Sequence, residues 1–155
     1  MAFKSQIKAR FTDAVLFECE LDSKYESEPE SVVLGAAVKK AVNTGANLAR
    51  AYLAGANLDG ANLDGANLAR ANLAGAKIGD YTIIKIITRV WRTIDTYEFI
   101  ALATDKGILI RAGCKTKTPT EYRVHVAEKY PGTDKAEETL AIIDFIEARA
   151  AKVTP

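Results

Sequence analysis

The chain has 155 residues, with 21 lysines and arginines against 20 aspartates and glutamates. This near-neutral charge excludes a general electrostatic attraction to nucleic acid or to an anionic membrane. The length fits one domain or two small ones. The sequence contains no run of eighteen apolar residues, so no membrane-spanning helix is predicted.

The N-terminal residues and the cysteines predict a soluble, cytoplasmic protein. The opening segment MAFKSQIKARF lacks the apolar centre of a signal peptide. Two thiols, Cys19 and Cys114, fit a reducing compartment better than a disulfide scaffold. A disulfide between Cys19 and Cys114 remains an open alternative.

Residues 9–23 allow two interpretations. They divide into the pentads ARFTD, AVLFE and CELDS, with a small residue first and Phe11, Leu16 or Leu21 third. This pattern indicates a degenerate opening portion of the repeats described below, in which Cys19 is a small inward residue. The alternative is an ordinary β-strand around residues 14–21.

A polar, acidic loop is expected over residues 22–31, and a short helix over residues 31–42. Ser31 is the expected N-cap, and Asn43-Thr44-Gly45 is the expected stop. A column of coiled repeats exposes an apolar end and unpaired strand edges. We therefore expect this helix to cover the first coil.

Seven pentads with one frame occupy residues 46–80: ANLAR AYLAG ANLDG ANLDG ANLAR ANLAG AKIGD. On a flat strand, leucines five residues apart alternate between faces, and on an α-helix they spiral around every side. Every leucine points inward only if the chain bends once per pentad. The segment from Ala46 nearly recurs from Ala66, which predicts four pentads per coil.

This stretch resembles the pentapeptide-repeat family, whose pattern is A-(D/N)-L-X-X. The resemblance implies a right-handed, four-sided β-helix. The expected inward residues of this repeat core share the third pentad position: Leu48, Leu53, Leu58, Leu63, Leu68, Leu73 and Ile78.

From Tyr81 onward the composition changes and the pentads stop. Strands are predicted over residues 81–92, 96–103 and 108–112, with a tight turn at Asp105-Lys106-Gly107. A helix is expected to begin at Thr118, with Glu121 completing a capping box, and to end near Tyr130. A last helix is expected from about residue 133 to 150, and it directs Leu140, Ile142, Ile143, Phe145 and Ile146 toward a core.

The predicted fold class is therefore mixed β and α+β: a short right-handed quadrilateral β-helix capped by a helix, followed by a small ββ(β)αα domain. The predicted domains are residues 1–80 and 81–155. The layout also resembles phage and prophage pentapeptide-repeat proteins, through RFTDAVLFECEL, LGAAVKKAV and IRAGC. Members with this layout are largely of unassigned activity.

The chain offers little for catalysis or metal binding, and we predict neither an enzyme nor a cofactor. A Cys114–His125 nucleophile pair needs thiolate activation and hydrogen-bond reach, which the sequence does not establish. One histidine and two distant cysteines do not form a zinc set. Phosphate-loop and nucleophile-elbow motifs are absent from the sequence.

One cluster of basic and aromatic residues is a candidate ligand-binding surface for phosphate or a nucleotide. The alternative is a solvated sheet face with one core tryptophan. The candidate residues are Lys85, Arg89, Arg92, Trp91, Arg111, Lys115, Lys117 and Arg123.

Three functions are considered. The first is a non-catalytic binding or assembly protein, with the repeats as a rigid scaffold and open ends that favour homo-oligomers. The second is sequestration of a small anionic ligand or nucleotide signal in phage counter-defence. The third is a DNA mimic that modulates a topoisomerase, for which the column is short and its charge balanced. The protein partner is not identifiable from the sequence, and no membrane or nucleic-acid partner is expected.

Overall fold

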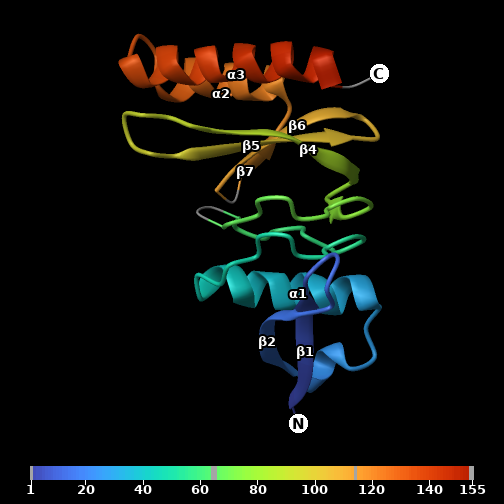
Figure 1. The fold of residues 1–155 in the computed structure, drawn as a ribbon. Coiled ribbons are helices and arrows are strands. Elements are labelled where there is room, and N and C mark those ends of the chain that lie inside the picture. Colours follow the sequence, from blue (N-terminus) through green and yellow to red (C-terminus); the bar gives the residue numbers. More distant parts are fainter. Residues whose placement is uncertain (1, 64–65, 114, 154–155) are drawn as a thin grey trace.

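The computed structural model describes residues 2–63, 66–113 and 115–153. Its layers follow the chain along one axis, from an N-terminal hairpin through helix α1, the repeats and a sheet to helices α2 and α3 (Figure 1). This order places the repeats between α1 and the sheet.

The pentads bury the third residue of every repeat. Leu48, Leu53, Leu58, Leu63, Leu68, Leu73 and Ile78 are all at most 4% exposed. The chain returns to the same side after twenty residues, because Tyr52 pairs with Asn72 and Asn57 with Lys77 in parallel. Backbone hydrogen bonds such as Leu53 N to Asn72 O (2.9 Å) hold the two coils together. We call residues 46–80 the repeat column.

The pentads that carry asparagine bend by a shared local cause. The asparagine side-chain oxygen accepts a hydrogen bond from the backbone N–H two residues on, as Asn72 Oδ1 does from Ala74 N at 3.0 Å. The fifth residue then adopts the left-handed conformation, with φ of 76° at Gly75. Arg50 and Arg70 adopt it as well, with φ of 63° and 59°. In these contacts the asparagine side chains therefore form turns within single pentads.

Helix α1 (Glu30–Asn43) covers the first coil. Its buried residues Ala37, Val38 and Ala41 belong to the same apolar cluster as the repeat leucines. Asn57 N donates to the carbonyl oxygen of Ser31 at 2.8 Å. The helix begins one residue earlier than predicted, with Pro29 at the cap position, so the prediction of Ser31 as N-cap is wrong.

The N-terminal residues form an antiparallel hairpin of β1 (Ala2–Lys8) and β2 (Val15–Asp22) on the other side of α1. The interpretation of residues 9–23 as pentads is therefore wrong, and the strand interpretation holds for β2. Phe11, expected inward, is 80% exposed. The hairpin joins the column through an antiparallel bridge between Ala9 and Ala51. A short 3-10 helix, Ser23–Tyr25, follows β2.

The second end of the repeat column meets a five-stranded antiparallel sheet in the order β3-β4-β5-β6-β7. The strands are β3 (Lys77–Ile78), β4 (Tyr81–Trp91), β5 (Glu98–Thr104), β6 (Gly107–Ala112) and β7 (Lys115–Lys117). Every residue of β5 is buried. Strands β1 and β7 were not predicted from the sequence, because neither shows a clear apolar alternation.

The central strands serve two cores on opposite faces of the sheet. Ile100, Leu102 and Leu109 join the apolar cluster of the repeat column. Phe99, Ala101 and Ile110 pack instead with the helices. The hydrophobic core of the column therefore continues across the domain boundary predicted at residue 80.

Helices α2 (Pro119–Lys129) and α3 (Asp134–Val153) cover the far face of the sheet. The capping box at Thr118 and Glu121 is confirmed, with Tyr130 as the C-cap of α2. Ile142, Ile143 and Ile146 are buried against the sheet. Phe145, predicted to be in this core, is 52% exposed, so that prediction is wrong.

Gly35 on α1 tests the contact between the helix and the first coil. A Cβ atom at this position would lie 1.9 Å from the carbonyl oxygen of Asn57. We expect Gly35→Ala to lower the free energy of unfolding by about 3 kcal/mol or more, because backbone atoms must separate. Chemical denaturation measures this loss. Gly60→Ala is the control, since φ is 66° there but the Cβ meets open space, and its cost should stay near 1 kcal/mol. Equal losses in the two variants would contradict the close approach.

Candidate functional site: a cationic aromatic cavity

A cavity of about 260 Å³ lies between the sheet and the two C-terminal helices. Its walls come from the end of β4, the loop before β5, the strands β5 and β7, and the helices α2 and α3. The lining residues are Arg92, Asp95, Tyr97, Phe99, Lys115, Tyr122, His125, Val126, Tyr130, Lys135 and Thr139. Aromatic and cationic side chains thus dominate its surface.

The aromatic side chains form a continuous row of edge-to-face contacts. Ring centroids lie 5.8 Å apart for Tyr97 and Phe99, and 6.0 Å apart for Phe99 and Tyr122. The row continues from Tyr122 to His125 at 6.2 Å and from His125 to Tyr130 at 6.0 Å. Tyr122 and His125 share a face of α2 because they are three residues apart. This geometry is the favoured one for aromatic pairs and fixes the ring edges at the cavity wall.

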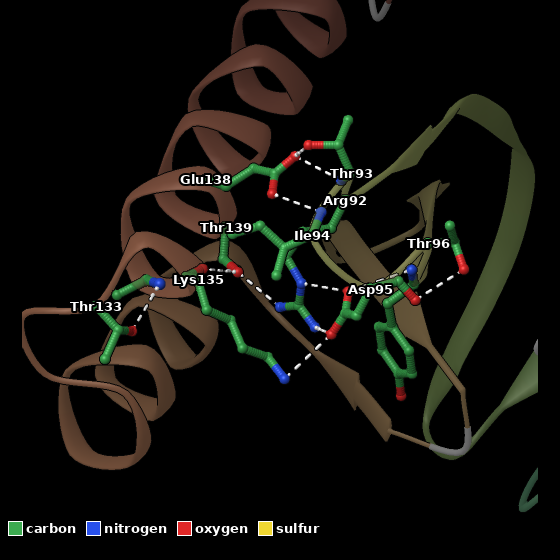
Figure 2. A network of polar contacts seen from close by, with 11 residues as sticks. Arg92, Thr93, Ile94, Asp95, Thr96, Thr133, Lys135, Glu138 and Thr139 are labelled. Atoms are coloured by element: carbon green, nitrogen blue, oxygen red, sulfur yellow. Dashed lines mark hydrogen bonds and ion pairs between the residues drawn. The ribbon is translucent and has the colours of Figure 1, made fainter.

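An ion pair between the buried Arg92 and the partly exposed Asp95 organises the floor of the cavity (Figure 2). Arg92 is 5% exposed, and its Nε and Nη2 donate to the two carboxylate oxygens of Asp95 at 2.8 and 2.7 Å. Arg92 Nη1 donates to Thr139 Oγ1 at 2.8 Å, and Lys135 Nζ lies 3.1 Å from Asp95 Oδ2. The hydrogen bonds from Arg92, with support from Lys135 and the Tyr97 backbone, hold the pKa of Asp95 well below its usual range.

A second carboxylate fixes the loop that carries Asp95. Glu138 on α3 accepts hydrogen bonds from the hydroxyl and backbone N–H of Thr93 and from Ile94 N. The Thr93 hydroxyl, its backbone N–H and that of Ile94 lower the pKa of Glu138, against the effect of burial. Glu138 and Lys135 of α3 therefore both hold the loop between β4 and β5, and the cavity wall is preorganised.

His125, one of the lining residues, lies in a positive field. Burial lowers the pKa of this imidazole, and Lys115, Lys117 and Lys129 lower it further. Glu128 opposes them weakly. The imidazole is neutral at pH 7 as a result, because its usual pKa is already about 6.5.

The structure separates most residues of the predicted basic surface. Arg92 and Lys115 line the cavity. Arg89 instead donates to Glu98 Oε1 (2.6 Å) and to the carbonyl of Ala66 in the repeat column (2.7 Å). These contacts give Arg89 a structural position between sheet and column.

The other residues of that surface also have local partners. Arg111 is 2% exposed and donates to Thr116, whereas Arg123 pairs with Asp144 and Glu147 on α3. Lys85 donates to the carbonyl of Val153, and Trp91 is 53% exposed with the Arg89 guanidinium 5.5 Å from its ring centroid. Lys117 lies on β7 near His125. A ligand-binding role for the whole set stays a prediction.

Sequence reasoning missed Asp95, Phe99, Val126, Tyr130, Lys135 and Thr139 as lining residues. The three-residue spacing of Tyr122 and His125, which share a face of α2, was an available signal. Nothing in the sequence indicates that Lys135 and Thr139 of α3 meet the end of β4, because the contact spans more than forty residues.

The thiols and metal ligands add no second site within the described residues. No group of three or more His, Cys, Asp or Glu side chains there is placed to hold a metal ion. Cys19 is a free, half-buried thiol whose pKa burial raises. Cys114 lies outside the described residues, and with it both the Cys114–His125 pair, which was considered but not predicted, and the alternative Cys19–Cys114 bridge. Among the described helices, none is long and apolar enough to cross a membrane.

Asp95→Asn tests the ion pair of the cavity floor. Loss of the carboxylate leaves Arg92 buried without its partner, so we expect about 2 kcal/mol less stability at pH 7, moderated by the partial exposure of Asp95. The native pKa of Asp95 is lowered, so its contribution is complete above the unfolded pKa near 4 and is lost as pH falls below it.

The difference between wild type and the Asp95→Asn variant should therefore shrink between pH 5 and pH 2, as measured by chemical denaturation. Asp144→Asn, which alters an ion pair whose carboxylate is 68% exposed, is the control and should change stability by less than about 0.5 kcal/mol. A pH-independent difference would show that the carboxylate charge is not the source.

Comparison with known proteins gives one match. Residues 44–79 match the family model for pentapeptide repeats in eight copies. Neither the curated proteins nor the solved structures contain a match to this chain. The family relationship therefore concerns the centre of the chain: residues 44–79 are pentapeptide repeats.

Proposed function

We propose that the protein is a non-catalytic binding protein, in which a right-handed quadrilateral β-helix of pentapeptide repeats serves as the scaffold for the C-terminal sheet and helices. Pentapeptide repeats imply this helix, and the twenty-residue spacing of the parallel bridges supports it. A cytoplasmic location and a phage origin belong to the same proposal.

The observation that carries the scaffold role is the continuous apolar core. Leucines of the repeat column, three α1 residues and Ile100, Leu102 and Leu109 of the sheet belong to one buried cluster. Arg89 adds a polar connection from β4 to the Ala66 carbonyl. This cluster packs the sheet on the repeat column, and the cavity lies on the opposite face of the same sheet.

Homo-oligomerisation, expected from the sequence through open column ends, stays a prediction. In the described part of the chain, α1 covers the first coil, and the sheet covers the other end. Any self-association requires a different surface.

Sequestration of a small anionic ligand is the second candidate function, and the cavity favours it. Arg92, Lys115 and Lys135 line this cavity, and Asp95 is the acidic residue among its lining. A nucleotide signal of a phage defence system is one member of this ligand class.

Leu53→Ala tests the scaffold role through cooperative unfolding. Leu53 is fully buried in the column, and its truncation should cost about 2–5 kcal/mol. Trp91 on β4 reports the C-terminal unit by fluorescence, whereas circular dichroism reports the helices. If the column and the C-terminal unit unfold as one cooperative unit, both signals shift by the same amount. Tyr52→Ala, at a neighbouring residue that is 51% exposed, is the control and should cost less than about 1 kcal/mol. If the unfolding transition measured by Trp91 fluorescence is the same in Leu53→Ala and wild type, the rigid scaffold is contradicted.

A thermal-stability panel of nucleoside monophosphates and small carboxylates tests the ligand function. A bound compound at about 100 times its Kd should add about 2.7 kcal/mol of stability. Lys115→Glu should abolish this gain, because it reverses a charge at the cavity. Lys39→Glu makes the same charge change on α1 and should preserve the gain. Stabilisation that survives Lys115→Glu would place the ligand elsewhere.

A further inference from the structure

The cavity carries more positive charge than its own carboxylate can neutralise. The single acidic residue among the lining, Asp95, is engaged by Arg92 and Lys135. Within the described residues, Lys115, which lines the cavity from β7, has no ion pair. An uncompensated charge beside a partly closed cavity attracts an anion more strongly than one in open water.

Helix α2 and its C-cap contribute aromatic rings to the cavity lining. Tyr122, His125 and Tyr130 meet edge to face, so their ring planes are steeply inclined to one another, at 86° in both pairs. A planar guest ring in contact with this row finds both faces and edges as partners, which are the favoured aromatic contacts. An aliphatic guest of equal volume gains only the apolar area.

The volume limits the guest to a small molecule. At about 260 Å³, the cavity is just below the roughly 300–1,000 Å³ of typical ligand pockets. One ring with one charged substituent suits this space. Gly113 contributes to it, because a Cβ there would lie 2.5 Å from the Tyr97 hydroxyl and displace that ring.

We propose that the cavity binds a single-ring aromatic anion, with the ring against Tyr122, His125 and Tyr130 and the anionic group beside Lys115. This inference rests on the proposed ligand-binding function and specifies its ligand class. The anion also adds a negative charge near His125, where Lys115, Lys117 and Lys129 now oppose protonation and Glu128 weakly favours it. Binding therefore favours proton uptake by the imidazole.

Isothermal titration with four probes tests the ligand class. Benzoate carries both ring and charge, cyclohexanecarboxylate only the charge, benzamide only the ring, and inorganic phosphate a charge without an apolar body. We expect benzoate to bind most tightly, and each of the other three about tenfold more weakly or not at all.

Paired variants locate the bound probe. Lys115→Ala should weaken benzoate binding about tenfold and leave benzamide unchanged. Tyr130→Leu should weaken benzoate but not cyclohexanecarboxylate. Lys39→Ala is the matched control and should bind like wild type. Circular dichroism and thermal unfolding establish that each variant is folded.

Proton coupling supplies an independent readout. Wild type should bind benzoate more tightly at pH 6 than at pH 8, because benzoate stays ionised while His125 gains a proton. His125→Gln should remove this difference. A pH-independent affinity in wild type would overturn the placement of the anion beside His125.

The outcomes separate this inference from the function on which it rests. If cyclohexanecarboxylate or phosphate binds as well as benzoate, the anion site stands and the aromatic ligand class is wrong. If none of the four probes binds at millimolar concentration, while a nucleotide stabilises the protein in the panel above, the single-ring inference is wrong and the ligand function stands. If neither the four probes nor any nucleotide binds, the single-ring inference and the ligand function are both wrong. The scaffold role then rests on cooperative unfolding alone.

Discussion

The burial of one leucine in every five residues is the constraint on which this structure depends. Five residues fit neither a flat strand nor a helix, so the chain must turn after each leucine. Asparagine supplies the turn through its side-chain oxygen, and the fifth residue absorbs the left-handed backbone conformation. The resulting coils have two apolar ends, which α1 and the sheet cover. The position of the cavity follows from this arrangement, because the second cover also forms one of its walls.

The repeats were the most predictable part of the fold. The inward set from Leu48 to Ile78 and the twenty-residue recurrence could be obtained from spacing alone, because each pentad repeats the same local argument. The capping box at Thr118 was equally local. The N-terminal hairpin was harder: residues 9–23 carry apolar residues at a five-residue spacing, yet Phe11 is in solvent and β2 pairs with β1. The structure of residues 15–22 depends on pairing with the polar strand β1, and the sequence pattern of Ala2–Lys8 does not predict a strand there.

The candidate site was predictable only in its residue types. Basic and aromatic residues between Lys85 and Arg123 suggested anion binding, but most arginines among them neutralise carboxylates or fill structural positions. Arg89 and Arg123 illustrate this, since each pairs with an acidic residue that sequence distance hides. Arg92 and Lys115 reach the cavity together with Lys135, which comes from a helix outside the predicted cluster. The tertiary fold brings these three side chains together, so a local sequence pattern cannot predict the site.

The twenty-residue return of the chain limits how a protein of this design can change its length. Both ends of the column are occupied, so growth is possible only by insertion between existing coils. A full set of four pentads would lift the C-terminal unit by one layer and keep its orientation. A single inserted pentad would instead rotate that unit by a quarter turn about the column and point the cavity toward another side. The number of repeats thus determines the direction in which the cavity faces.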